Sequence, residues 1–196
     1  MNSPHRIIVA ITGASGAVYG KRTLEALKDA GVEAHLVVSK AAEMTLKYEL
    51  DLKATDLESL AANRYSATDI GAPISSGSFK TDGMIIAPCS VKTMSEIATG
   101  VTTNLISRAA DVILKERRRL VLMVRETPFH LGHLRTMTAL TEMGAIIAPP
   151  LPSFYIEPKS VDELVDQSVG RVLDLFDIDS PLVQRWGTDL EKGARP

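Results

Sequence analysis

Short apolar runs alternate along the chain with longer segments in which apolar positions recur at helical spacing. The short runs predict five buried strands, at residues 6–11, 33–38, 84–87, 120–124 and 145–148. The longer segments predict five helices, at residues 16–30, 39–50, 104–117, 131–143 and 160–176. Residues 63–83 are rich in Gly, Ser and Pro, and we expect them to form an extended surface loop.

The predicted strands are nearly continuous apolar runs, and predicted helices separate most of them. This pattern is typical of a parallel sheet covered by helices on both faces. The 196 residues are enough for one such α/β domain with a substantial core. We therefore expect a single domain over residues 1–196, with a loose tail from about residue 187. Ligands of such folds bind at the carboxyl ends of the strands, so the loops there are the places to look for chemistry.

Composition narrows the class of protein without identifying it. The formal net charge is −2, which gives no electrostatic reason to expect a nucleic-acid partner. No segment approaches the roughly 20 apolar residues that a membrane span needs. The chain has one cysteine, Cys89, so it forms no intrachain disulfide, and we expect a cytosolic, reducing location.

The stretch TGASGA, residues 12–17, follows the first predicted strand and opens the first predicted helix. Gly13 and Gly16 let the backbone come close to an anion, and the N–H groups of a helix start attract negative charge. Ser15 adds a hydroxyl donor. An ordinary strand-to-helix turn with a serine cap explains the same residues equally well. The motif alone leaves both interpretations open.

Two further loops follow strands. In PCSVKT, residues 88–93, Ser90 and Thr93 offer donors for a polar ligand, whereas we expect Cys89 to be a small buried residue. In RETPFHLGH, Glu126 is either a general acid/base or a structural partner of Arg125. His130 and His133 lie in the same loop, but no third ligand at metal-binding spacing accompanies them.

Cationic and aromatic side chains form a second group of candidates. Arg108 and Lys115 are seven residues apart, nearly two helical turns, and therefore share one face of the predicted helix. That face is either a solvated basic surface or a clamp for a phosphate. In PPLPSFY, prolines stiffen the loop that carries Tyr155, whose O–H could hold an anion or simply cap a rigid surface loop.

Taken together and in order, these segments resemble the UbiX/Pad family of flavin prenyltransferases. The matching stretches are TGASGA, VVSKAA, ISSGSF, TDGMIIAPCSVKT, SRAADVILKERRRLVLMVRETPFHLGHLRTM, MGAIIAPPLPSFY, GRVLDLF and RW. They extend from about residue 5 to 187, and the run 103–155 is the most specific. The HLGHLRTM version resembles the bacterial UbiX branch, which feeds ubiquinone biosynthesis. The resemblance implies a Rossmann-like or flavodoxin-like three-layer fold of the flavin-containing decarboxylase type, assembled as a homododecamer.

The resemblance also implies the ligands and the site. Reduced FMN would receive a dimethylallyl group from dimethylallyl phosphate at N5 and C6, without a metal, to make prenylated FMN for a UbiD-type decarboxylase. The residues implied to bind FMN are Gly13, Ala14, Ser15, Ser39, Ser90, Val91, Lys92, Thr93 and Arg125. Those implied to surround the prenyl phosphate, some of them from neighbouring subunits, are Arg108, Lys115, Tyr155, Arg171 and Trp186. The implied catalytic residues are Ser15, Glu126 and Lys115, with Glu126 as the proton shuttle.

Two other functions compete with this interpretation. An FMN-dependent decarboxylase of cysteine-like carboxylates uses a related fold, but needs a histidine base after the first strand-to-helix turn. This chain has Tyr19 and Lys21 in that region and no histidine. An FMN carrier would bind the flavin without chemistry, and it would have no use for Lys115, Glu126 and Arg171.

Overall fold

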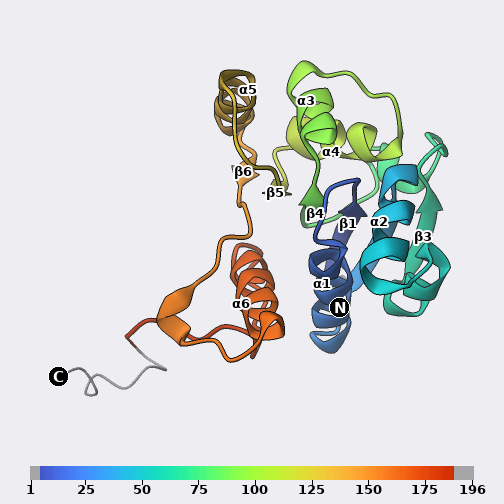
Figure 1. Ribbon diagram of the computed structural model, residues 1–196. Helices are drawn as coiled ribbons and strands as arrows, with labels where there is room; N and C mark the ends of the chain where they lie inside the picture. Colours follow the sequence, from blue (N-terminus) through green and yellow to red (C-terminus); the bar gives the residue numbers. More distant parts are fainter. Residues whose placement is uncertain (1–4, 188–196) are drawn as a thin grey trace.

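The computed structural model describes residues 5–187, so the predicted loose tail lies outside it except for Gly187. Its centre is a six-stranded sheet in which every neighbouring pair is parallel. The strand order is β3-β2-β1-β4-β5-β6 (Figure 1). The strands are β1 Arg6–Ile11, β2 Glu33–Val38, β3 Asn63–Ser66, β4 Gly83–Cys89, β5 Arg119–Val124 and β6 Ile146–Ile147.

Six α-helices connect and cover the strands. They are α1 Ala17–Asp29, α2 Lys40–Leu50, α3 Val91–Thr99, α4 Leu105–Lys115, α5 Leu131–Glu142 and α6 Val161–Asp174. Short polar side chains begin several of them: Ser39, Ser90 and Ser160 each accept a hydrogen bond from a backbone N–H of the first helical turn. None of the described helices is long and apolar enough to cross a bilayer.

The sheet has a separate apolar core on each face. Alternate residues of β1, beginning with Ile7 and Val9, pack with α1, α2 and α6. The intervening residues Ile8 and Ala10 pack with α3, α4 and α5 on the opposite face. Because both faces of the sheet are buried, the strands consist of continuous apolar residues. The arrangement confirms the predicted three-layer α/β fold.

The structure differs from the predicted elements in two regions. Helix α3, Val91–Thr99, lies between the predicted strand 84–87 and the predicted helix 104–117, where no helix was predicted. Residues 63–83 are not a loop throughout: β3 lies in this segment, pairs with β2, and forms the edge of the sheet. Three of the four β3 residues are exposed, and only Tyr65 is half-buried, stacking its ring on His35 at 5.9 Å. An exposed polar edge strand lacks the apolar alternation on which the prediction depended.

Candidate functional site

Four strands that are neighbours in the sheet, β2, β1, β4 and β5, are followed by loops at the same edge of the sheet. The strand order reverses between β1 and β4, which is where ligands bind in open parallel sheets. Backbone bonds continue the pairing just past the strand ends: Ser39 N donates to the Ile11 carbonyl at 3.0 Å, and Arg125 N donates to the Cys89 carbonyl at 3.1 Å. The loops after β2, β1, β4 and β5 therefore leave the sheet side by side.

Thr12, a residue that the sequence reasoning did not single out, ties the two central loops together. Its side chain is fully buried. The hydroxyl donates to the Pro88 carbonyl at 2.8 Å and accepts from Ser90 N at 2.8 Å. The start of α3 is thus held in a fixed position against the loop that follows β1.

The predicted FMN-binding residues all lie along this edge. Gly13 and Ser15 are exposed after β1, and Ala14 is partly exposed between them. Ser39 and Ser90 are the N-caps of α2 and α3, and their hydroxyl oxygens accept from Ala42 N at 3.1 Å and Thr93 N at 3.3 Å. The remaining predicted residues follow in the first turn of α3 or after β5: Val91, Lys92, Thr93 and Arg125.

The loop after β1 already holds a carboxylate. Glu49, near the end of α2, accepts from Gly16 N at 2.9 Å and from Ala17 N at 2.8 Å. It therefore satisfies the first N–H groups of α1, where the sequence left open whether an anion binds. Glu49 lies 33 residues from Gly16 in the chain, so no local pattern could have pointed to this contact. A phosphate meets less competition at the start of α3, where Ser90 caps the helix.

The loop edge offers a close backbone approach and donors for a phosphate-bearing ligand. A Cβ atom at Gly13 would lie 2.4 Å from the Ala41 Cβ, so only glycine allows the loop after β1 to approach α2 this closely. The hydroxyls of Ser39 and Ser90, the first turn of α3 and the exposed guanidinium of Arg125 supply donors of the kind that bind a phosphate.

Three of the predicted prenyl-phosphate residues meet in a separate cleft. Tyr155, Arg171 and Trp186 line a cleft of about 430 Å³ together with the segment 183–185. The Tyr155 and Trp186 rings meet edge to face with centroids 5.6 Å apart. A cation beside two aromatic rings suits an apolar chain that ends in an anion.

Asp174 organises the cations of this cleft. Its carboxylate accepts from Arg185 at 2.8 Å and 2.9 Å and from Arg171 at 2.7 Å. Hydrogen bonds from Arg185, only partly offset by burial, and the nearby Arg171 hold the pKa of Asp174 below its usual range. Sequence reasoning named Arg171 alone. Asp174 and Arg185 resemble ordinary surface charges in the sequence.

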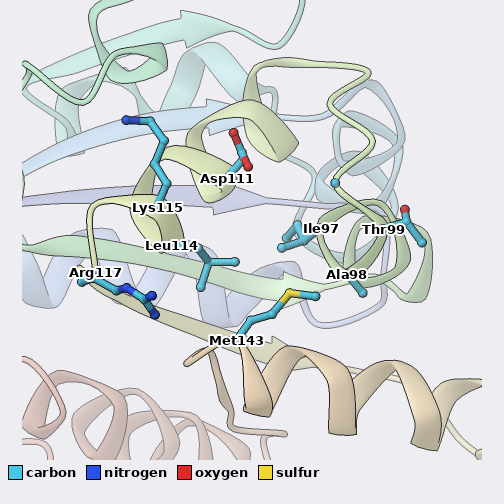
Figure 2. A pocket seen from close by; sticks show the side chains of 9 residues that line it. Ile97, Ala98, Thr99, Asp111, Leu114, Lys115, Arg117 and Met143 are labelled. Carbon is cyan, nitrogen blue, oxygen red and sulfur yellow. The ribbon is translucent and has the colours of Figure 1, made fainter.

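The structure does not bring Arg108 and Lys115 to that cleft within one chain. Both lie on α4, which covers the face of the sheet opposite α6 (Figure 1). Arg108 donates to Asp111 at 2.7 Å and to the Ser75 carbonyl at 3.2 Å, whereas Lys115 pairs with Glu116. Lys115 and Leu114 are among the residues that line a groove of about 480 Å³ (Figure 2).

Residues after β5 and on α1 connect the loop edge to α6. The Glu126 carboxylate accepts from Thr127 N at 2.9 Å, and no ion pair with Arg125 forms among the described residues. Burial raises the pKa of Tyr19, while the nearby Arg125 guanidinium and a hydrogen bond with Ser168 on α6 act in the opposite direction. Tyr19 on α1 therefore lies between Arg125 of the loop edge and Ser168 of α6.

Cys89 and the two histidines have structural surroundings. Cys89 is fully buried, and burial raises the pKa of its thiol well above the usual range. His130 caps α5 by accepting from Gly132 N at 3.0 Å, and its ring stacks on His133. In residues 5–187, no group of three or more His, Cys, Asp or Glu side chains gathers at metal-binding spacing.

Known proteins resemble this chain over nearly its whole length. It matches the flavoprotein family over residues 1–183. The flavin prenyltransferase UbiX of Thauera aromatica is 56% identical over 187 residues, which cover 95% of this chain and 96% of that protein. The crystal structure of AnUbiX (PadA1) with FMN and dimethylallyl pyrophosphate superposes with a TM-score of 0.92 at 53% identity, covering 94% of this chain and 98% of that one.

A second solved structure agrees with the first. The dodecameric FMN-dependent UbiX-like decarboxylase from Escherichia coli O157:H7 superposes with a TM-score of 0.90 at 47% identity, covering 92% of this chain and 98% of that one. The chain therefore belongs to the flavoprotein family, within its UbiX flavin prenyltransferase branch.

Proposed function

We propose that this protein is a flavin prenyltransferase that transfers a dimethylallyl group from dimethylallyl phosphate to N5 and C6 of reduced FMN. The observation that carries the proposal is the cleft in which Tyr155, Arg171 and Trp186 gather, in addition to the donors at the loop edge. A flavin carrier has no need of a second, cationic and aromatic cleft. A cysteine decarboxylase would need a histidine base near Tyr19, and the sequence has none there.

In this proposal the loop edge holds FMN. Its phosphate lies at the start of α3, where Ser90, the first helical N–H groups and Arg125 provide donors. Glu49 keeps a phosphate away from the start of α1, since two anions there would repel each other. Ser15 and Glu126 then remain beside the reacting part of the flavin. Reduced FMN, when bound, supplies the nucleophile.

The cleft side chains act on the leaving group. Arg171 and Tyr155 donate hydrogen bonds to the departing phosphate, and Trp186 presents an aromatic face to the electron-poor five-carbon chain. Two such donors, at roughly 3 kcal/mol each in the transition state, are worth about 10⁴-fold in rate. Glu126 moves the proton that the alkene needs for ring closure, either directly or through Ser15.

Self-association completes the site. Arg108 and Lys115 lie on α4, across the sheet from the cleft, so we assign their contribution to the cleft of a neighbouring copy. Large apolar side chains before and after Tyr155 in the chain are exposed in the single chain, with Leu151 at 71%, Phe154 at 73% and Val161 at 73%. Exposed apolar surface of this kind is buried in stable assemblies. A homododecamer, as in the Escherichia coli O157:H7 relative, would cover it.

Two further parts of the proposal concern the cell. The product, prenylated FMN, would pass to a UbiD-type decarboxylase, because a modified flavin has use only in an enzyme that consumes it. We place the reaction in the cytoplasm, where a free cysteine such as Cys89 persists.

Mass spectrometry of the flavin tests the proposal directly. The purified protein is incubated without oxygen with reduced FMN and either dimethylallyl phosphate or the diphosphate. We expect the flavin mass to increase by one prenyl unit with at least the monophosphate. An unchanged flavin mass with FMN-bound protein would reject prenyl transfer.

Glu126→Gln tests the proton shuttle within the same assay. We expect this variant to bind FMN with parental affinity and to form ring-closed product at least about 100-fold more slowly, the usual contribution of a positioned general acid. Glu142→Gln, which removes an exposed carboxylate near the end of α5, is the control. Parental turnover by Glu126→Gln would make Glu126 a structural residue.

A further inference from the structure

Gln167 is a buried polar side chain directly behind the Tyr155 cleft. It lies in the middle of α6 and is 1% exposed. Its amide nitrogen donates to the Tyr155 hydroxyl at 2.9 Å and to the Gln184 carbonyl at 3.1 Å, and its amide oxygen accepts from Gln184 N at 2.9 Å. A buried amide with every donor and its oxygen engaged is held in one orientation.

The hydrogen-bond partners determine the positions of the amide oxygen and the amide nitrogen of Gln167. The backbone of Gln184 offers one N–H and one carbonyl, so the Gln167 oxygen must face the N–H and the Gln167 nitrogen must face the carbonyl. The nitrogen's second hydrogen is then directed at Tyr155. Because this contact uses the phenol oxygen as the acceptor, the phenol's own hydrogen has to find a different partner.

The phenol hydrogen has only a weak partner inside the protein. Among the described residues its acceptor is the Gln184 carbonyl at 3.5 Å, which is long for a hydrogen bond from a hydroxyl. Tyr155 also lines the cleft, as does Arg171, which is one helical turn beyond Gln167 on α6. A phosphate oxygen in the cleft would be a stronger acceptor for this hydrogen than the distant carbonyl.

Gln167 also fixes the wall of the cleft. Its two bonds to Gln184 hold the segment that continues into Arg185 and Trp186. The neighbouring Gly170 lets this segment lie directly on α6, since a Cβ there would be 2.4 Å from Val183. One side chain therefore sets both the direction of the phenol hydrogen and the position of the aromatic wall.

We propose that Gln167 is a positioning residue of the prenyl-phosphate site, which makes the Tyr155 hydroxyl a donor to the phosphate. This inference rests on the proposed function of the cleft. A positioning role differs from a purely structural one in a testable way. If Gln167 acts by orienting the Tyr155 hydroxyl, changing Gln167 lowers phosphate affinity only when that hydroxyl is present.

Gln167→Glu separates the two roles. A carboxylate of the same length still accepts from Gln184 N, but its other oxygen accepts where the amide nitrogen donated, so it captures the phenol hydrogen. We expect the KM for dimethylallyl phosphate to rise about 10- to 100-fold, the range for losing one hydrogen bond to a charged group. The KM for reduced FMN stays at the parental value.

A double-mutant cycle removes effects of the added charge itself. Tyr155→Phe alone should raise the KM for dimethylallyl phosphate to a similar extent, and Gln167→Glu should add less than about threefold in that background. Equal effects of Gln167→Glu in both backgrounds would overturn the proposal. If Gln167→Glu does not bind FMN, the test rests on Tyr155→Phe. Unchanged phosphate affinity in Tyr155→Phe would then overturn the proposal.

Binding of inorganic phosphate separates this inference from the proposed reaction. Trp186 is the chain's one tryptophan and contacts Tyr155, so its fluorescence reports on the cleft without turnover. We expect the phosphate Kd to rise in Gln167→Glu and in Tyr155→Phe, without additivity. If the variants weaken phosphate binding as expected but the parent protein transfers no prenyl group, the proposed function is rejected and the role of Gln167 stands. If the parent protein is active but Gln167→Glu leaves the phosphate Kd unchanged, the role of Gln167 is rejected and the proposed function stands.

Discussion

Replacing Thr12 with valine removes the hydroxyl that joins the loops after β1 and β4 while preserving the shape of the side chain. The variant loses a buried bond to Pro88 and a partly buried bond from Ser90, each 2.8 Å long. The Pro88 carbonyl keeps a backbone partner, Thr12 N, at 3.2 Å, but the Ser90 N–H is left without one. An unsatisfied buried N–H costs about 1–3 kcal/mol, so we expect unfolding free energy to fall by about 2–3 kcal/mol.

The assay is thermal unfolding of the FMN-free protein, followed by FMN titration. For a chain of this size the loss corresponds to a decrease in Tm of about 4–12 °C. Thr12→Ser is the matched control, because it keeps the hydroxyl and removes only a methyl group, at a cost of about 1 kcal/mol. FMN affinity should fall about tenfold in Thr12→Val alone, since Ser90 is released. The reasoning fails if Thr12→Val matches the parent, or if Thr12→Ser is the less stable variant.

Two further predictions concern buried positions away from the loops. Gly20→Ala should destabilise by about 2–3 kcal/mol in urea unfolding, although alanine normally favours a helix, because its Cβ would lie 2.4 Å from the Ala87 carbonyl oxygen. Gly132→Ala meets only the exposed His130 ring and should be tolerated, so equal losses would contradict the packing argument. Burial lowers the pKa of His35, so the unfolded chain binds a proton there more readily than the folded one. The resulting stability is complete above about pH 6.5 and declines as the pH falls below it, and His35→Gln should flatten the dependence of the urea midpoint on pH. An unchanged slope in that variant would assign the pH dependence to other groups.

The sequence predicted the fold where burial leaves a periodic signal. Residues 6–11 and 33–38 match β1 and β2 because both faces of these strands are covered, which requires continuous apolar runs. The strand β3 went unpredicted because pairing with β2, rather than its own side chains, makes it a strand. Edge strands are determined by a neighbour that local patterns do not reveal.

The same distinction applies to the site. Loops that follow strands could be identified from position alone, and the structure brings Ser15, Ser39 and Ser90 to one edge. Glu49 and Gln167 could not be identified, because each acts on residues distant in the chain. Gln167 occupies an amphipathic helix, where a single glutamine resembles any solvated polar residue until the segment carrying Gln184 covers it.

The bond between Thr12 and Ser90 joins residues 78 positions apart. During synthesis at 5–20 residues per second, the loop after β1 therefore exists for on the order of ten seconds before its partner leaves the ribosome. In the proposed site the FMN phosphate lies at the start of α3, so a nascent chain that stops short of β4 lacks part of that site. The proposed site thus implies that flavin binds late in synthesis, after the loops that follow β1 and β4 have been joined by Thr12 and Ser90.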